Sequence, residues 1–254
     1  MKTVFITGAT KNTGLAIARH FAQNNYNVAI SSRKSDTAAK AAEKIEKEFA
    51  VKCRGYALNL IDVSNINQVF YQVEKDFGTL DVFVANAANL GIGLDFLDTD
   101  QQNFADIVNT NIRGTFFCCQ AAAEIMKKCG GGSIVTIGSV QATGAVGGRT
   151  VYSMTKAALS ALVKNIAYEL GEYGIRANNI VAGAIHSSRW DELSKEEILK
   201  RRARYPIGRE STEQEIANAV LYLASDLSAS VTGSDLTVDS GISICLLPYS
   251  KQKN

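Results

Sequence analysis

The sequence of 254 residues has little proline, with only Pro206 and Pro248, and it lacks internal repeats and low-complexity stretches. Linkers between domains are usually rich in proline, glycine or polar residues, so no segment indicates a domain boundary. No apolar run approaches the roughly 18 residues that cross a bilayer, and the amino terminus lacks a signal-peptide pattern. We therefore expect one domain over residues 1–254, a cytoplasmic location and no membrane partner.

Excess charge and paired cysteines are missing as well. The chain has 27 basic and 25 acidic residues, a formal net charge of +2. So small a charge creates no strong field toward nucleic acid, and we expect a small-molecule partner instead. The five cysteines are odd in number and scattered without a C-x-x-C pair, which argues against a disulfide framework and a zinc site. We interpret them as buried packing residues and expect no metal.

What the sequence does contain is a regular alternation of short apolar runs rich in β-branched residues and longer segments of helical period. The first four are Val4–Thr7, Gly14–Asn24, Asn27–Ser32 and Asp36–Phe49. Further strands are expected at Lys52–Leu58, Leu80–Ala85, Ser133–Gly138, Ile175–Val181 and Asp235–Val238. This βαβ pattern predicts an α/β fold with a doubly wound parallel sheet, the Rossmann fold, in a single domain.

The alternation stops between Ala184 and Glu210, where the chain becomes polar and charged. We interpret this segment as an insertion placed to act as a substrate lid. Trp190 within it either contacts a ligand or packs internally, and His186 is most simply a solvated loop side chain. The run from Lys200 to Arg204 would suit an acidic carrier protein, but a solvated helix face is the favoured interpretation.

A glycine-containing turn, Thr7 to Gly14, follows the first strand and precedes an alanine-rich helix. Gly8 would permit a tight turn, and Gly14 would allow the helix to pack closely on the strand. The N–H groups at the helix terminus would then face a pyrophosphate. A turn with two glycines also occurs for purely structural reasons.

The second strand ends without the acidic residue that holds a ribose 2′-hydroxyl, and Ser32 is followed directly by Arg33. Arg33 and Lys11 could bracket a 2′-phosphate, which a carboxylate would repel. The sequence therefore favours NADP(H) over NAD(H), with solvated loop charges as the alternative interpretation of this pair.

The candidate catalytic groups are Tyr152 and Lys156, four residues apart at the start of a strongly helical segment. That spacing places both side chains on one helix face. A nearby ammonium favours a phenolate and is expected to lower the tyrosine pKa. Ser139 closes an earlier strand at the carboxyl edge of the sheet, where its hydroxyl could hydrogen-bond a substrate oxygen.

These residues, in this order and spacing, resemble the short-chain dehydrogenase/reductase family from Lys2 to about Ile244, with a likeness to its 3-oxoacyl-carrier-protein reductases. The resemblance implies that Tyr152 passes a proton, that Lys156 lowers its pKa and holds the nicotinamide ribose, and that Ser139 orients the carbonyl. It also implies that Asn111 holds a water of the proton relay, although Asn111 alone could mark a helix kink. The residues that carry the resemblance are the turn with Gly8, Asn12, Thr13 and Gly14, then Asn59-Leu60, Asn86-Ala87, Asn111, Ser139, Tyr152 with Lys156, Gly183 and Val231-Thr232-Gly233.

For the cofactor, the resemblance implies that Asn59 and Leu60 contact adenine and that Ile185 and Ser187 meet the nicotinamide amide, although Asn59 alone could be a turn residue. Three positions depart from the family pattern. Asn12 stands in place of the middle glycine, Ala88 replaces a glycine near the cofactor, and Ala182 precedes Gly183 where proline is usual. Asparagine tolerates left-handed backbone, so Asn12 is the mildest change, and none of the three touches the proton-transfer groups.

We therefore expect an NADP(H)-dependent oxidoreductase that interconverts a carbonyl and a secondary alcohol. Acyl thioesters, sugars or polyols, and steroids all remain open as substrates. One alternative is a catalytically silent NADP(H)-binding protein of the same fold, and another is a lyase of the halohydrin type, which Gly8 and Lys156 oppose. Alanine-rich helices at Gln120–Lys128 and Ala157–Leu170 have more apolar surface than one sheet face needs. The resemblance to the family implies that these helices pair to form a homotetramer or homodimer.

Overall fold

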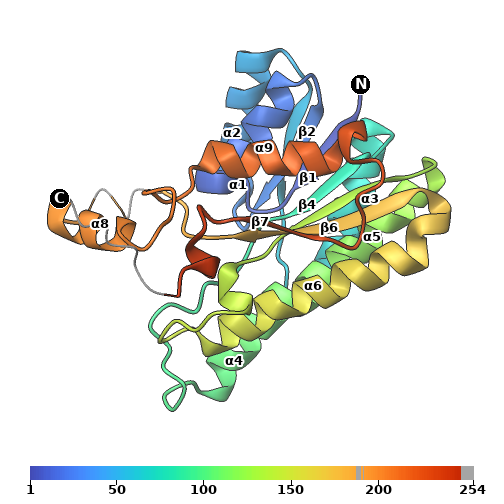
Figure 1. The fold of residues 1–254 in the computed structure, drawn as a ribbon. Helices are drawn as coiled ribbons and strands as arrows, with labels where there is room; N and C mark the ends of the chain where they lie inside the picture. The colour runs from blue at the N-terminus through green and yellow to red at the C-terminus, as the bar shows by residue number, and fades with distance from the viewer. Residues whose placement is uncertain (187–189, 191, 247–254) are drawn as a thin grey trace.

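The computed structural model describes residues 1–186, 190 and 192–246. Their strands form one parallel sheet in the order β3-β2-β1-β4-β5-β6-β7 (Figure 1). This arrangement confirms the predicted doubly wound α/β fold in a single domain. The strands are β1 (Thr3–Ile6), β2 (Asn27–Ser32), β3 (Cys53–Ala57), β4 (Val82–Ala85), β5 (Gly132–Ile137), β6 (Ile175–Ala182) and β7 (Asp235–Val238).

Helices cover both faces of the sheet. On one face lie α1 (Asn12–Gln23), α2 (Ser35–Phe49) and α9 (Glu213–Ala224). On the other lie α3 (Val63–Phe77), α5 (Thr115–Lys128) and α6 (Thr150–Leu170). Further helical segments in the described part of the chain are α4 (Gln101–Val108), α8 (Lys195–Arg202), the π-helical turn η1 (Asn109–Gly114) and the short turns η2 (Val140–Ala142), η3 (Gly171–Tyr173), η4 (Asp226–Ser228) and η5 (Ile242–Ile244).

Alternate residues of the central strands point into two separate cores. In β1, Val4 and Ile6 join the core beneath α1 and α9, whereas Phe5 joins the core beneath α3 and α5. Phe5 packs edge-on against Phe70 with ring centroids 5.0 Å apart. Because helices cover both faces, β1 and β4 are buried at every position, which is why their sequences are continuously apolar.

The strand order places a crevice beside β1. The chain passes from β1 to β2 and β3 on one side and then crosses to β4 on the other side. Connections that leave in opposite directions open a crevice at the carboxyl ends of the strands, which is where ligands of such sheets bind. The turn after β1 and the residues after β4 therefore border the candidate site.

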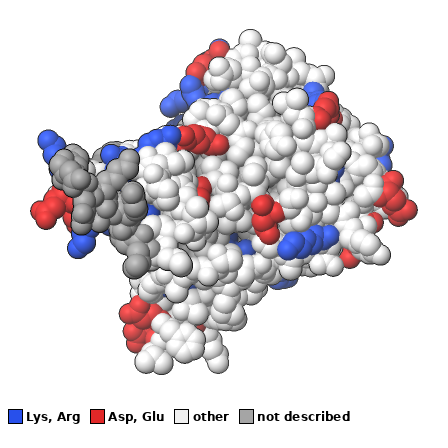
Figure 2. Space-filling view, viewed as in Figure 1, with Lys and Arg blue, Asp and Glu red and all other residues white. Residues whose placement is uncertain are grey.

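Within the described part of the chain, no helix is both long and apolar enough to cross a membrane. On the face shown in Figure 2, acidic and basic side chains are scattered between broad uncharged areas. This face carries no large field of a single sign.

Candidate active site

The turn after β1 adopts the left-handed backbone that its sequence indicates. Gly8 has φ +64° and Asn12 has φ +50°. Asparagine is among the few residues other than glycine that visit this region readily, so Asn12 accommodates the turn in place of a glycine. The departure of Asn12 from the family pattern therefore leaves the turn intact.

Gly14 lies where α1 passes closest to the turn. A Cβ at this position would be 2.5 Å from the Gly8 carbonyl oxygen and 2.6 Å from Asn86 Nδ2. The sequence prediction that Gly14 permits close packing of the helix is thus matched by the geometry, because any side chain here would push α1 away from β1.

Asn86 and Ala87 connect the end of β4 to the glycine turn. Asn86 Nδ2 donates to the carbonyl oxygens of Thr7 at 2.9 Å and Gly8 at 3.2 Å. Thr7 Oγ1 in turn accepts from the backbone N–H groups of Asn86 and Ala87, both at 3.1 Å. These four bonds fix both sides of the crevice relative to each other.

The amino terminus of α1 is open toward this crevice. Its N-cap residue is Lys11, which makes no side-chain capping bond, whereas Asp62 and Thr212 cap α3 and α9 with their side chains. Within the described residues, the first N–H groups of α1 at Asn12, Thr13 and Gly14 have no hydrogen-bond partner. Such exposed N–H groups, at the positive end of a helix dipole, fit a dinucleotide pyrophosphate.

Lys11 and Arg33 lie on neighbouring loops. The glycine turn is held against the end of β2 by bonds from Ala9 N to Ser31 O at 3.1 Å and from Gly8 N to Ser31 Oγ at 3.4 Å. Both cations are exposed, and neither forms an ion pair with any described residue. Ser32 next to them closes a local turn with its Oγ, which bonds to Lys34. The expected phosphate role of the two cations stays a prediction.

Asn59 and Leu60 follow β3. Asn59 N–H donates to Asn65 Oδ1 at 2.8 Å, and Asn59 Oδ1 accepts from Ile61 N at 3.3 Å, which is the turn role open to this residue from sequence. Leu60 packs closely against Gly114. Their contact with adenine remains a prediction.

The structure brings Ser139, Tyr152 and Lys156 together. Ser139 follows β5, and the other two lie on the first turns of α6. All three are buried, with 8%, 8% and 5% of their surfaces exposed. Ser139 hydrogen-bonds to Tyr152, Lys156 Nζ donates to the Ile137 main-chain oxygen at 2.5 Å, and the same Nζ lies 5.6 Å from the Tyr152 ring centroid.

The protonation of this group differs from the sequence expectation. Burial raises the pKa of Tyr152 above its usual value of 10, and this effect outweighs the hydrogen bond from Ser139 and the charge of Arg149, which both lower it. Burial also lowers the pKa of Lys156 to about 8. Spacing predicted the proximity of the two groups correctly but not the desolvation that both share.

Asn111 lies in η1, which interrupts the helical path between α4 and α5. Its Oδ1 accepts from Asn89 N at 2.7 Å, and its Nδ2 donates to Asn89 O at 2.9 Å and to Thr155 Oγ1 at 3.0 Å. Both amide protons are therefore used by the protein. The predicted water would have to meet the second lone pair of Oδ1 or the main-chain carbonyl.

The end of β6 carries the next group of predicted residues. Gly183 N donates to Val238 O at 3.0 Å, and a Cβ on Gly183 would lie 2.7 Å from Asp239 Cα. Ile185 forms a parallel bridge with Ser211, so the two ends of the 184–210 insertion lie side by side. Ser187 lies outside the described residues.

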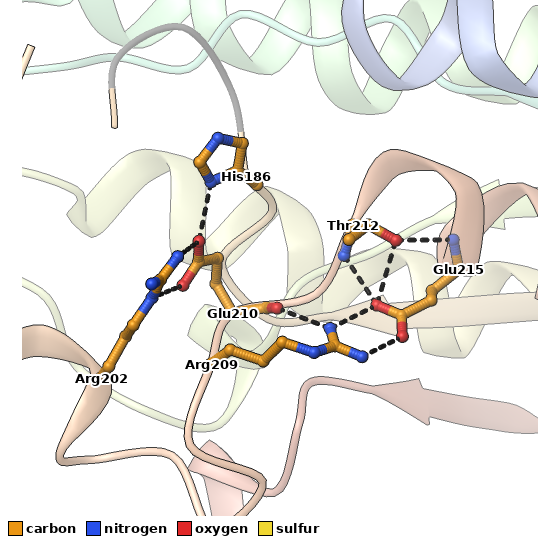
Figure 3. Close-up of polar contacts among 6 residues, drawn as sticks. All are labelled: His186, Arg202, Arg209, Glu210, Thr212 and Glu215. Carbon is orange, nitrogen blue, oxygen red and sulfur yellow. Dashed lines mark hydrogen bonds and ion pairs between the residues drawn. The ribbon is translucent and has the colours of Figure 1, made fainter. Parts of the chain in front are cut away.

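The base of the insertion holds a buried carboxylate that sequence reasoning missed. Glu210 is 3% exposed, and its carboxylate accepts a hydrogen bond from Arg202. His186 Nδ1 lies 2.7 Å from Oε1 of the same carboxylate (Figure 3). The side-chain hydrogen bond from Arg202 is the main cause that lowers the pKa of Glu210 to about 2. The His186 side chain is 43% exposed, as expected of a solvated ring, but it also contacts the Glu210 carboxylate, which the sequence did not indicate.

Two other expectations for the insertion are decided by packing. Trp190 is 6% exposed, with its ring 6.2 Å from that of His186 and 5.6 Å from Arg201 Cζ, so it packs internally. In the basic run, Arg201 contacts the Trp190 ring and Arg202 bonds to Glu210, but Lys200, Arg201 and Arg204 are all exposed, and Arg202 is half-buried. The run is therefore largely the solvated helix face that the sequence suggested, with Arg202 as the exception.

Arg149 is a further site residue that the sequence did not single out. Its Cζ lies 5.6 Å from the Tyr152 ring centroid, and its Nη1 donates to Leu90 O at 2.7 Å. No short motif marks this arginine, because its partner Leu90 lies 59 residues away in the chain.

Comparison with known proteins agrees with this geometry. A family model described as enoyl-(acyl carrier protein) reductase matches residues 8–243. Sorbose reductase SOU1 of Candida albicans is 34% identical over 245 residues, 94% of this chain and 86% of the relative. The 3-oxoacyl-(acyl-carrier-protein) reductase FabG of Staphylococcus aureus is 34% identical over 245 residues, 95% of this chain and 98% of the relative.

Among solved structures, a 7 alpha-hydroxysteroid dehydrogenase complexed with NADH and 7-oxo glycochenodeoxycholic acid matches with a TM-score of 0.87. It is 32% identical, and the match covers 94% of this chain and 93% of that chain. The parallel sheet and the match to these relatives over nearly the whole chain define an oxidoreductase. The chain belongs to the short-chain dehydrogenase/reductase family.

Proposed function

We propose that this protein is an NADP(H)-dependent oxidoreductase that interconverts a carbonyl and a secondary alcohol, with Tyr152 as the acid or base. The observation that carries this proposal is the burial of Ser139, Tyr152 and Lys156 in one cluster at the carboxyl edge of the sheet. The relatives named for sorbose, 3-oxoacyl and hydroxysteroid chemistry support the same class of reaction.

The bound nicotinamide would supply a hydride to the carbonyl carbon, or accept one from the alcohol carbon in reverse. Tyr152 then donates its phenolic proton to the carbonyl oxygen. Ser139 Oγ steadies the charge that develops on that oxygen by hydrogen bonding. Lys156 retains two N–H donors beyond its bond to Ile137 O, and its charge favours the phenolate that remains on Tyr152.

Asn111 serves this mechanism as a positioning residue. Its bond to Thr155 Oγ1 fixes η1 against α6, and Thr155 itself donates to the Tyr152 main-chain oxygen at 2.7 Å. These hydrogen bonds therefore hold three segments together next to the Tyr152 main chain, namely the loop at Asn89, η1 and the first turns of α6.

Preference for NADP(H) is supported by the two exposed cations, Lys11 and Arg33, which no described carboxylate neutralises. The first N–H groups of α1 would hold the pyrophosphate, and Lys156 would hold the nicotinamide ribose. A 2′-phosphate near Arg33 would receive bidentate hydrogen bonds from the guanidinium.

The experiment that tests this function is coenzyme oxidation by the purified protein. NADPH and NADH are compared across a panel of ketoses, a 3-oxoacyl thioester, a diketone and an oxo-steroid. We expect NADPH-dependent reduction of at least one carbonyl compound. Dinucleotide binding without turnover of any panel member would favour the catalytically silent alternative.

We also propose assembly into a homotetramer, or a homodimer, through the outer face of α5 and α6. A cavity of about 240 Å³ lies between these helices, and its lining combines apolar side chains such as Phe116, Leu162 and Ile166 with polar ones at Gln120, Glu124, Lys127 and Glu169. Phe116 is 46% exposed, which is unusual for a phenylalanine on a helix surface. Solution scattering is expected to give a mass of two or four chains, and a clean monomer would contradict the proposal.

A further inference from the structure

Arg149 stands directly before α6 and faces the candidate proton donor. It is the N-cap residue of the helix but makes no side-chain capping bond. Its Cζ lies 5.6 Å from the Tyr152 ring centroid, the same distance as Lys156 Nζ. The phenol ring thus has two cations at equal distance, of which the sequence motif includes one.

A second set of contacts fixes the position of this guanidinium. Arg149 Nη1 donates to Leu90 O at 2.7 Å, and the main chain of Arg149 forms a parallel bridge with Leu94. The same loop is held one residue earlier by Asn111, which bonds to both main-chain groups of Asn89. Arg149 is therefore not a free side chain that happens to point at Tyr152.

The charge of Arg149 is not neutralised within the described residues. Other arginines there, such as Arg19, Arg202 and Arg209, form ion pairs with glutamates, whereas no described carboxylate pairs with Arg149. Asp95 is a carboxylate close to the preceding residue, since its Oδ1 would lie 3.2 Å from a Cβ added to Gly148, but it forms no ion pair with Arg149 within the described residues. One bond to Leu90 O also leaves four of the five N–H donors of the guanidinium without a described partner.

Within the described residues, the Tyr152 ring has three charged or polar side chains around it. Ser139 contributes a hydroxyl from the end of β5, Lys156 contributes an ammonium from α6, and Arg149 contributes a guanidinium from the start of α6. Because burial lowers the pKa of Lys156 to about 8, the ammonium loses charge as the pH rises through that value. A guanidinium keeps its charge at every pH that the protein withstands.

We propose that Arg149 is a positioning residue for Tyr152, and that the permanent positive charge of its guanidinium, held beside the ring by Leu90, favours the phenolate form of Tyr152. This inference rests on the proposed function of Tyr152 as acid and base. The direction agrees with the Arg149 charge, which lowers the pKa of Tyr152 against the opposing effect of burial.

The test is an alkaline titration of tyrosinate by ultraviolet absorbance, in which the signal of Tyr152 is the difference between a protein and its Tyr152→Phe counterpart. The range is limited to pH values at which circular dichroism shows a folded protein. In an Arg149→Met background we expect the Tyr152 midpoint to rise by about one pH unit, so that less tyrosinate forms at each pH. The rise of kcat/KM with pH for alcohol oxidation, which follows the ionisation of Tyr152 as the base, should also move to higher pH.

Two further variants separate charge from structure. Arg149→Lys keeps a cation and should leave the midpoint close to that of the wild type, even if the bond to Leu90 is lost. Arg19→Met removes an arginine that stacks on Phe49 at 5.4 Å, far along the chain from Tyr152, and should change nothing.

Coincident titrations of the wild type and Arg149→Met would overturn the inference, as would an Arg149→Lys midpoint that moves as far as that of Arg149→Met. Because the absorbance titration needs no substrate, its outcome is independent of the proposed function. Absence of turnover with a shifted midpoint would reject only the proposed function, and turnover with coincident titrations would reject only the role of Arg149.

Discussion

Glu210 accepts two parallel hydrogen bonds from Arg202, at 2.8 Å from Nε to Oε2 and at 2.7 Å from Nη2 to Oε1 (Figure 3). Arg202 is the last residue of α8, and Glu210 lies beside the bridge between Ile185 and Ser211. His186, at the start of the insertion, reaches the same carboxylate. One buried carboxylate therefore connects both ends of the insertion with its helix.

Replacement of Glu210 by glutamine should loosen α8. The variant leaves the Arg202 guanidinium without its anion, at an expected cost of about 2 kcal/mol in the free energy of local opening. Amide hydrogen exchange of α8 should become faster, and KM for the substrate should rise more than kcat falls. The control is Glu48→Gln, which removes the bidentate partner of Arg19. Both side chains of this pair are exposed, Glu48 at 43% and Arg19 at 45%, so the loss should cost less than about 0.5 kcal/mol in the free energy of unfolding. Equal effects of the two variants would contradict the role of Glu210.

The ion pair between Glu210 and Arg202 should also make the stability of α8 depend on pH in the acid range. The pKa of Glu210 is about 2 in the folded protein, below its unfolded value of 4.5. A lowered carboxyl pKa stabilises the folded state fully above the unfolded value, and this stabilisation falls as the pH drops from 4.5 toward 2. We expect α8 amide protection, corrected for intrinsic exchange, to decline over this interval and not between pH 5 and 8. The absence of a decline between pH 4.5 and 2 would contradict this role of Glu210.

Tyr152→Phe removes one hydroxyl from a buried site and should abolish most turnover. General acid or base catalysis contributes about 10²- to 10⁴-fold, so kcat should fall by a factor in that range while NADPH affinity stays unchanged. Tyr168→Phe on the same helix is the matched control, because Tyr168 is 90% exposed. Steady-state kinetics and fluorescence titration of NADPH give both quantities. Substantial turnover in Tyr152→Phe would refute the assignment.

The fold was predictable from the sequence because periodicity encodes which faces are buried. Strands such as Val4–Thr7 appear as short runs rich in apolar residues since both sheet faces are covered. The structure has β1 and β2 within one residue of the predicted bounds Val4–Thr7 and Asn27–Ser32. The proximity of Tyr152 and Lys156 was predictable as well, because a spacing of four residues fixes a shared helix face.

The missing parts depend on contacts that no local pattern encodes. The position of Arg149 depends on its hydrogen bond to Leu90 O. That of Glu210 depends on contacts with His186 and Arg202, which lie 24 and 8 residues away in a segment without periodicity. The raised pKa of Tyr152 likewise reflects burial among distant elements, which the motif does not specify. Such properties require the tertiary structure.

Coenzyme preference should depend on Arg33 and Lys11. Arg33→Ala removes a guanidinium that would bond to the 2′-phosphate, and such a bond contributes about 1.5–3 kcal/mol. The Kd for NADPH should therefore rise by roughly tenfold to a hundredfold, while the Kd for NADH changes little. Lys11→Ala should act in the same direction with a smaller effect. Lys40→Ala removes an exposed charge from α2 and serves as the control. Equal losses for both coenzymes in Arg33→Ala would contradict the preference for NADP(H).

Gly14→Ala should damage the coenzyme site through the backbone and not through any lost contact. The added Cβ would lie 2.5 Å from Gly8 O and 2.6 Å from Asn86 Nδ2, so α1 has to move away from the turn that Asn86 holds. Overpacking of this kind costs about 1–3 kcal/mol in the free energy of unfolding. Movement of α1 would also misplace its open N–H groups, and the Kd for both coenzymes should therefore rise together.

The matched control is Gly171→Ala, because a Cβ at Gly171 has no neighbour within 4 Å and its φ of −59° is helical. Alanine there should be neutral or slightly stabilising, since it reduces the conformational freedom of the unfolded chain. Denaturant unfolding and fluorescence titration measure the two effects, and unchanged coenzyme affinity in Gly14→Ala would show that the pyrophosphate does not bind at the terminus of α1.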